Sequence, residues 1–248
     1  MAKTFLKQNP HPGLFIVIEG IDYTGKETQS KFLTRRLKNQ KTKVAYFDFP
    51  QYGQRSAVFA EDYLAGEYGE ATKIDPVVVS LFYALDRFAA SNKIKQALSK
   101  GRVVVSNRFS ASSLGHQGGK FRSLKDKKIY WNWLLNFEHK ILHIPNPDVS
   151  FILMIPLEVS LKLKKQRNKS KFSSATKIKV VVDQHERDSQ HLKNARQSYL
   201  QLARTYPRQY KIIDCYDKQN HSILPIKVIH EKIWQELSKN KKFRKLSK

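Results

Sequence analysis

The sequence predicts a three-layer α/β fold, with a five-stranded parallel sheet and helices on both of its faces. Two observations lead to this prediction. Short apolar runs alternate with segments of helical spacing along the chain, which is the pattern of strand–helix–strand units. The first apolar run also leads into a glycine-containing loop that opens a helix. We expect one domain, with its core at about residues 13–238 of the 248-residue chain.

Five segments carry the apolar, β-branched composition of buried strands. The first is Leu14–Ile18, which ends in Glu19; the others are Val44–Phe47, Val103–Ser106, Val149–Ile155 and Lys211–Asp214. In parallel sheets of this kind, ligands bind beyond the carboxyl ends of the strands. Glu19, Asp48 and the pair Asn107-Arg108 should therefore lie at the ligand edge.

The segments between the strands have helical spacing. The expected helices are Gly25–Asn39, Ser56–Ala65, Pro76–Ser99, Lys127–Leu142, Glu158–Gln166, Gln184–Tyr206 and Ile223–Ser238. The fourth of these contains a group of aromatic residues, which we interpret as packing against the sheet and not as a cofactor site: Tyr130, Trp131, Trp133 and Phe137.

Two basic segments lack this regular pattern. Residues 167–179 are polar and rich in serine, which favours a mobile loop within a lid at about residues 166–182. The basic tail, residues 239–248, is expected to be frayed or disordered.

The composition is strongly basic, with 46 Lys and Arg against 21 Asp and Glu and a net charge of +25. Such a balance attracts polyanions, so nonspecific polyanion binding is possible, and it also suits small phosphorylated substrates. The single cysteine, Cys215, excludes a disulfide framework and favours a reducing cytoplasm. Neither a membrane-spanning run nor a signal peptide is recognisable, so we expect no membrane association.

The segment GIDYTGKETQ, residues 20–29, is close to the phosphate-loop pattern G-x-x-x-x-G-K-[ST]. Its glycines permit a tight turn around a phosphate, and the helix N-terminus adds partial positive charge. The pattern departs at Glu27, where a hydroxyl is usual. The residues expected to bind the phosphates of a nucleotide are Gly20, Ile21, Asp22, Tyr23, Thr24, Gly25, Lys26, Glu27 and Thr28.

Four segments, in this order, resemble the thymidylate kinase family of nucleoside monophosphate kinases. They are GIDYTGKETQ, FPQYGQRS, LFYALDR and NRFSASSLGHQGG. The resemblance covers nearly the whole chain and implies a P-loop NTPase fold. It also implies phosphoryl transfer from ATP to dTMP, giving dTDP and ADP for dTTP synthesis, with Mg²⁺ as cofactor and a homodimer as the assembly.

The resemblance also assigns residues to the dTMP site. The assigned residues are Phe49, Pro50, Tyr52, Arg55, Tyr83, Arg87, Arg108, Ser113, His116 and Gln117. Tyr83 would stack on thymine, and Arg87 would bond its O4. The family usually has FPRY, with an arginine near the phosphate; Gln51 stands in that place, and Arg55 is the candidate substitute.

The catalytic residues that the resemblance implies are Lys26, Arg108, Asp22 and a cation from the lid. Arg108 follows a buried strand, and its guanidinium can clamp phosphate oxygens. The phosphate loop has no arginine of its own, so Arg167 is the expected lid cation. Lys165, Lys169 and Lys171 are the alternatives: Lys165 just before Arg167, and the other two just after it.

Two positions depart from the family together. Glu27 replaces the hydroxyl after Lys26, and Asn107 replaces the aspartate before Arg108. We expect the two side chains to face each other across the magnesium site, with Glu27 as the metal-binding carboxylate. Decay of an abandoned site is the rival explanation.

Two other functions remain open at this point. A deoxynucleoside kinase of the same fold would need a carboxylate base after the second strand, where FPQY has none, although Asp48 lies just before it. A non-catalytic, polyanion-binding homologue with an altered metal site would account for the positive charge and for Glu27 and Asn107.

Overall fold

A computed structural model describes residues 9–172 and 189–246 of the chain. Its centre is a five-stranded parallel sheet with the order β2-β3-β1-β4-β5. The strands are β1 (Leu14–Glu19), β2 (Val44–Asp48), β3 (Val103–Asn107), β4 (Val149–Met154) and β5 (Tyr210–Asp214). The predicted five-stranded parallel sheet is confirmed.

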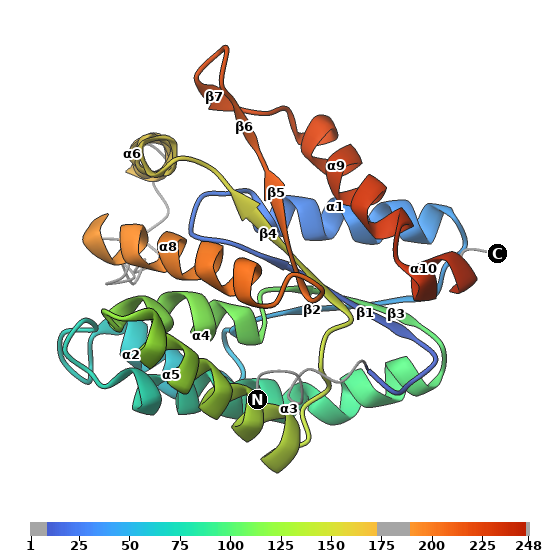
Figure 1. The fold of residues 1–248 in the computed structure, drawn as a ribbon, viewed down its shortest axis with the longest axis horizontal. Coiled ribbons are helices and arrows are strands. Elements are labelled where there is room, and N and C mark those ends of the chain that lie inside the picture. The colour runs from blue at the N-terminus through green and yellow to red at the C-terminus, as the bar shows by residue number, and fades with distance from the viewer. Residues whose placement is uncertain (1–8, 173–188, 247–248) are drawn as a thin grey trace.

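Helices cover both faces of the sheet, as Figure 1 shows. One face packs against α1 (Lys26–Asn39), α9 (Ile226–Ser238) and α10 (Lys241–Leu246). The other packs against α3 (Pro76–Ser99), α4 (Ser110–His116), α5 (Leu124–Asn136) and α8 (Ser189–Thr205). The three-layer arrangement is thereby confirmed.

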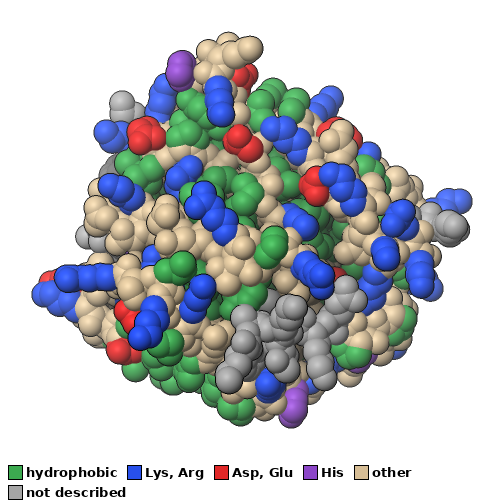
Figure 2. Space-filling model, in the orientation of Figure 1, with side chains coloured by type: hydrophobic (Ala, Val, Ile, Leu, Met, Phe, Trp, Pro, Cys, Tyr) green, Lys and Arg blue, Asp and Glu red, His purple; other side chains and the backbone are tan. Residues whose placement is uncertain are grey.

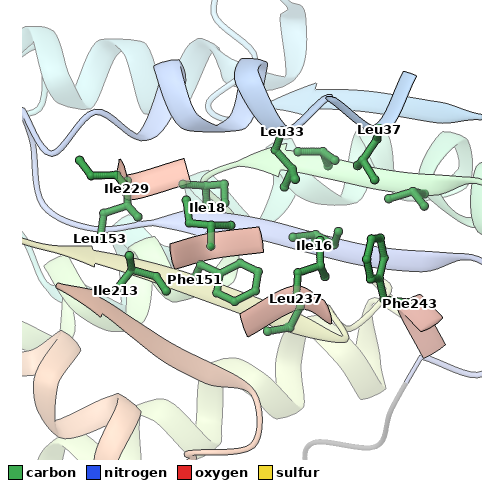
Figure 3. Packing of buried hydrophobic residues seen from close by; sticks show 14 of the residues in the cluster. Ile16, Ile18, Leu33, Leu37, Phe151, Leu153, Ile213, Ile229, Leu237 and Phe243 are labelled. Atoms are coloured by element: carbon green, nitrogen blue, oxygen red, sulfur yellow. The ribbon is translucent and has the colours of Figure 1, made fainter. Parts of the chain in front are cut away.

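Alternation along each strand divides the side chains between the two layers of helices. Ile16 and Ile18 of β1 belong to the cluster that contains Leu33 and Leu37 of α1, and Figure 3 shows the four side chains together. Phe15, the neighbour of Ile16, packs instead in the cluster under α3. The same alternation decides which way the polar residues at the strand ends face.

Several helix boundaries differ from the predicted ones. Before α2 (Val58–Ala65) a 3-10 turn, η1, covers Arg55–Ala57, and after α5 a π-helical turn, η3, covers Phe137–Ile141. The predicted start of α5 at Lys127 was late, because Ser123 caps the helix by accepting a hydrogen bond from the Asp126 backbone N–H at 3.0 Å. The short elements α4 and η2 (Gly118–Lys120) were not predicted as helical.

The predicted end of the fifth helix at Gln166 was also wrong, since α6 runs from Leu157 to Phe172. The first residues of the predicted lid therefore belong to this helix. The rest of the lid and the first residues of the helix predicted from Gln184 lie outside the described residues.

The predicted helix start at Ile223 was wrong. A small antiparallel pair, β6 (Tyr216–Asp217) and β7 (Ser222–Ile223), occupies this region. Pro225 precedes the first residue of α9, which is Ile226. A proline that lacks an N–H is tolerated at the start of a helix, and it sets the boundary here.

The expectation of a frayed tail is wrong for residues 241–246, which form α10. Phe243 is buried, and its ring meets Trp234 edge-on at 5.3 Å between centroids. Lys242 Nζ pairs with Asp148 Oδ1 at 3.2 Å. A buried aromatic ring and a partly buried ion pair thus hold the tail on the sheet layer, at the start of β1 and β4.

No helix within residues 9–172 and 189–246 has the length and apolar character needed to cross a membrane.

Candidate functional site

A cavity opens at the carboxyl ends of β1, β2 and β3. It is lined by Asp22, Phe49, Pro50, Tyr52, Leu64, Tyr83, Arg87, Arg108, Phe109, Ser112, Ser113, His116 and Gln117. Every residue predicted for the dTMP site is in this set except Arg55, which is exposed on the 3-10 turn before α2. Four segments far apart in the sequence therefore meet at one place.

Two of the residues that line the cavity, Tyr83 and Arg87, lie one turn apart on α3. Arg87 is 2% exposed, and its Nε donates to Glu138 Oε2 at 3.2 Å. Its Nη2 donates to Ser113 Oγ at 3.1 Å. Glu138, which is fully buried in the π-helical turn after α5, also accepts from Ser110 Oγ. These contacts fix the guanidinium at the wall of the cavity.

No pattern in the sequence indicates Glu138 as a site residue. It stands in a helical, amphipathic stretch, where a glutamate is ordinarily a surface residue. Its partner Arg87 is 51 residues away in the sequence, so no local pattern connects the two.

Gln51, which stands where the family has an arginine, is turned away from the cavity. Its side-chain Nε2 donates to Asp86 Oδ1 at 2.9 Å, and its backbone N–H donates to Asp86 Oδ2 at 2.9 Å. Ser56 Oγ donates to the same Asp86 Oδ1 at 2.7 Å. The hydrogen bonds to Asp86 connect the loop after β2 to α3. Neither Gln51 nor Arg55 brings a positive charge to the cavity.

Arg108 also lines the cavity. Its backbone has φ +62, an unusual value for a residue with a side chain, and its N–H donates to Ile18 O at 2.9 Å. The guanidinium forms an ion pair with Asp22 and donates to Gly20 O at 3.3 Å. The left-handed turn at the end of β3 thus aims the side chain across the phosphate loop.

Glu19, at the end of β1, holds the segment that follows Arg108, a role that the sequence does not indicate. It is fully buried and accepts hydrogen bonds from the Phe109 backbone N–H at 2.8 Å, from Ser112 Oγ at 2.8 Å and from Tyr199 OH at 3.2 Å. Burial raises the pKa of the Glu19 carboxyl, and the hydrogen bonds from Ser112 and Phe109 and the charge of Arg108 oppose that rise.

His116 and Gln117 end α4 and line the cavity. His116 Nε2 lies 3.5 Å from Arg108 Nη1, and its Nδ1 lies 3.3 Å from His191 Nε2 on α8. Burial lowers the pKa of His116 well below its ordinary value, so the ring is neutral at pH 7. Gln117 is 1% exposed, and its Oε1 has no hydrogen-bond partner among the described residues.

The phosphate loop joins β1 to α1. Gly20 has φ +139, and a Cβ there would lie 2.6 Å from Leu153 O, so only glycine fits. Gly25 has φ +82 and immediately precedes the first residue of α1, Lys26. Lys26 Nζ donates to Ile21 O at 2.6 Å and lies 3.8 Å from Asp22 Oδ1. The cation therefore sits inside the loop, at the N-terminus of a helix.

Other residues of the phosphate loop stabilise its turn through hydrogen bonds and backbone conformation. Thr24 is buried and its Oγ1 donates to Ile21 O at 2.9 Å. Tyr23 has φ +64, and Ser160 Oγ of α6 donates to Asp22 O at 2.9 Å. Thr28, the hydroxyl one place beyond the usual position, is exposed on α1.

The expectation that Glu27 and Asn107 face each other across a magnesium ion stays a prediction, and each of the two side chains has another partner in the structure. Asn107 Nδ2 donates to Asp48 Oδ1 at 2.8 Å, and Glu27 forms an exposed ion pair with Lys31. Glu27 is nevertheless close enough that its charge raises the pKa of Asp48, after the larger effect of burial. Asp48 thus bonds Asn107 and feels the charge of Glu27, although the sequence does not indicate it as a metal-site residue.

The oxygen-bearing groups near the first turn of α1 fit a hard cation such as Mg²⁺, which prefers oxygen ligands and retains several waters. Asn107 is 8% exposed and its Oδ1 has no hydrogen-bond partner among the described residues, which is the kind of atom that a metal-bound water would satisfy. No cluster of three or more His, Cys, Asp or Glu suited to a metal occurs in the described ranges. A site completed by nucleotide phosphates needs fewer protein ligands than that.

Arg167 lies on α6, whose Ser160 contacts the phosphate loop by donating to Asp22 O. Of the alternative lid cations, Lys165 is exposed on the same helix. Lys169 and Lys171 also fall within the backbone of α6. The role of Arg167 in catalysis remains a prediction.

Comparison with known proteins agrees with this geometry. A family model described as thymidylate kinase matches residues 18–223. A probable thymidylate kinase of Pyrococcus horikoshii is 28% identical over 222 residues, which are 88% of this chain and 97% of the relative. The thymidylate kinase of Pseudomonas entomophila is 29% identical over 203 residues, covering 82% and 87% respectively.

A solved structure of thymidylate kinase from Candida albicans has the same fold. The two structures superpose with a TM-score of 0.66 over 93% of each chain, at 18% sequence identity. With a family model that spans most of the sequence and a cavity lined by the expected residues, the chain belongs to the thymidylate kinase family.

Proposed function

We propose that this chain is a dTMP kinase, which transfers the γ-phosphoryl group of ATP to dTMP and releases dTDP and ADP. One observation carries the proposal. A single cavity is lined by Tyr83 and Arg87 and also by Arg108, which is paired with Asp22 of the phosphate loop. The base would lie against Tyr83 and Arg87, and the phosphate would lie near Arg108. A nucleoside monophosphate has the matching shape, with a flat base at one end and a phosphate at the other.

The base end suits thymine. Tyr83 offers a ring for stacking, and the fixed guanidinium of Arg87 offers donors to a carbonyl oxygen. Gln117 Oε1, buried and without a partner among the described residues, is an acceptor, and N3–H of thymine is a donor. Pairing them would remove the penalty of leaving a buried acceptor unsatisfied.

The phosphate end suits phosphoryl transfer, which needs alignment and neutralisation of charge more than covalent chemistry. Lys26 and the N-terminus of α1 would hold the phosphates of ATP, and Arg108 would clamp the acceptor phosphate and the transferred group. Asp22 holds Arg108 and Lys26 in place. Mg²⁺ bound near the first turn of α1 would neutralise charge on the phosphates of ATP.

The cavity also argues against a deoxynucleoside kinase. A phosphate oxygen is already ionised and needs no base, whereas a sugar hydroxyl does. Of the described residues that line the cavity, Asp22 is the one carboxylate, and Arg108 occupies it. Asp48 is not in the lining set, because alternation along β2 turns it toward α1 while Phe49 faces the cavity.

A coupled assay of ADP release tests the proposal. The purified chain is given ATP, Mg²⁺ and, in turn, dTMP, dUMP, UMP, dCMP and thymidine. We expect dTMP to give the highest kcat/KM and thymidine to give none above background. ADP release with thymidine alone would support the nucleoside kinase, and no release with any acceptor would support a non-catalytic homologue.

We also propose a homodimer in the cytoplasm, with α2 and α3 at the interface. Large apolar side chains on these helices are exposed: Val58, Phe59, Val78, Leu85 and Phe88. Exposed apolar residues gathered on one face commonly mark an interface. Light scattering after size exclusion would show a mass of two chains, and Phe88→Asp would reduce it to one.

The net charge of +25 supports weak, nonspecific attraction to polyanions as a by-product. On the face shown in Figure 2, Lys and Arg side chains are scattered among other residues, with no continuous basic strip. Such attraction would disappear as salt is raised to physiological strength. RNA binding that survives this salt would contradict the interpretation.

A further inference from the structure

The ends of β2 and β3 and the first turns of α1 are joined by a chain of polar contacts. Asp48 and Asn107 are partners in the β2–β3 register, and the Asn107 amide donates to Asp48 Oδ1 at 2.8 Å. Tyr46 OH donates to Asp48 Oδ2 at 3.3 Å and lies 3.2 Å from Ser30 Oγ. Ser30 Oγ in turn donates to Glu27 O at 2.9 Å. Asp48 is thereby held beside the helix that follows the phosphate loop.

Asp48 is open to solvent, whereas Asn107 behind it is buried. The side-chain amide of Asn107, whose nitrogen donates to Asp48, also has an oxygen that needs a hydrogen-bond donor. Asn107 Oδ1 is buried with no partner among the described residues, a state that native structures usually avoid. An ion or an ordered water next to Asp48 would supply that partner.

Glu27 is a weaker candidate for the same role. Its carboxylate is 58% exposed and is paired with Lys31, on the outer surface of α1. Its charge also acts on Asp48, because it raises the pKa of that carboxyl, after the larger effect of the partial desolvation of Asp48 beside Asn107. Two carboxylates that repel each other attract a cation between them, and Asp48 is the one that β2 and β3 hold in place.

We propose that Asp48 is the carboxylate of the magnesium site, held by Asn107, so that the acidic group expected at the end of β3 stands one strand further out, on β2. The proposal rests on the proposed function for its metal. It differs from the expectation drawn from the sequence, in which Glu27 of α1 supplies the carboxylate that is missing at Asn107. Here the carboxylate comes from Asp48, on the strand next to Asn107. Glu27 then contributes only general negative potential at the first turn of α1.

Mn²⁺ is a spectroscopic probe for such a site. Its affinity for the full chain with ADP bound is measured by electron paramagnetic resonance, without any acceptor. We expect Asp48→Asn to weaken Mn²⁺ binding by roughly tenfold to a hundredfold, as loss of a metal-site partner commonly does. Glu27→Gln should weaken it much less. Glu70→Gln, which removes an exposed charge elsewhere, controls for the change in net charge.

The double variant Asp48→Asn, Asn107→Asp moves the carboxylate back to β3 while keeping the pair and the net charge. We expect it to recover most of the Mn²⁺ affinity lost in Asp48→Asn, and circular dichroism would establish that both variants are folded. A folded double variant that recovers nothing would overturn the proposal. So would Glu27→Gln losing tenfold or more while Asp48→Asn keeps wild-type affinity, which would assign the role to Glu27.

This outcome is separate from that of the kinase assay. A chain that binds Mn²⁺ through Asp48 but releases no ADP with any acceptor would overturn the proposed function, and the assignment of Asp48 to the metal site would still hold. A chain that phosphorylates dTMP but whose Asp48→Asn variant binds Mn²⁺ normally would support the proposed function and overturn the metal-site proposal.

Discussion

Arg87 and Glu138 form a buried ion pair at the wall of the cavity, with side chains 2% and 0% exposed. Glu138 also accepts from Ser110 Oγ, so one carboxylate joins α3, α4 and the turn after α5. The pair orients the guanidinium and, at the same time, links three helices around the site.

Replacing Glu138 should therefore affect stability and binding together. Glu138→Ala leaves the charge of Arg87 buried without its partner, which typically destabilises a fold by about 3–5 kcal/mol. Urea unfolding measures the change. Glu70→Ala, at an exposed pair with Lys73, is the control and should leave the unfolding free energy close to unchanged. A small effect of Glu138→Ala would mean that water reaches Arg87 in its place.

Tyr83 should contribute to the affinity for dTMP and not for ATP. Stacking of a base on an aromatic ring contributes about 1–3 kcal/mol, so Tyr83→Ala should weaken dTMP binding roughly tenfold or more. Calorimetric titration of each nucleotide measures this, with Tyr83→Phe as the control that keeps the ring. Unchanged dTMP affinity in folded Tyr83→Ala would remove the residue from the base site.

Arg167 is predicted to act in the transition state. Arg167→Ala should lower kcat and leave the dissociation constant for dTMP nearly unchanged, which is how the loss of a transition-state contact is recognised. Steady-state kinetics and equilibrium binding separate the two effects. The matched variants Lys165→Ala and Lys169→Ala test the alternatives, and a larger fall in kcat for either would transfer the role to that lysine.

The parallel sheet was predictable because each of its strands is a short apolar run, and most of its helices have amphipathic spacing. The failures have local causes. The segment Ser110–His116 is a helix of seven residues with many serines, too short and too polar for periodicity to reveal. Residues 216–223 form a hairpin whose strands have only two residues each. Short elements leave little pattern in a sequence.

Most of the residues that line the cavity were predictable from motifs, but Leu64, Phe109 and Ser112 were not, and neither were the partners of the predicted residues. Nothing near Asn107 in the sequence indicates that its amide meets Asp48, 59 residues away. Gln51 stands where the family has an arginine near the phosphate, and nothing near FPQY in the sequence indicates that its side chain bonds Asp86. Motifs indicate which segments form a site, whereas contacts between segments depend on packing that the sequence does not display.

Stability should fall in mild acid because His116 is buried and neutral. Burial lowers its pKa in the folded state, so below about pH 6.5, the ordinary value, the unfolded chain binds the proton more readily. Stability is thus full above that pH and is lost progressively as pH falls toward the folded-state value. His116→Gln should flatten the slope of unfolding free energy between about pH 7 and pH 5. His221→Gln, on the exposed hairpin, is the control, and an equal slope in wild type and His116→Gln would contradict the interpretation.

The C-terminal helix α10 should be part of the folding unit and not a dispensable tail. Phe243 is 4% exposed, packs against Trp234 and belongs to the cluster that contains Leu37 and Leu237. Phe243→Ala should destabilise the chain by about 3–5 kcal/mol, the usual range for a buried phenylalanine. Lys245→Ala, which changes the same short helix without removing a buried ring, is the matched control.

Truncation after Lys239 should lower Tm at least as much as Phe243→Ala, because it also removes the contact between Lys242 and Asp148. If the truncated chain unfolds at the same temperature as the full one, α10 does not stabilise the sheet.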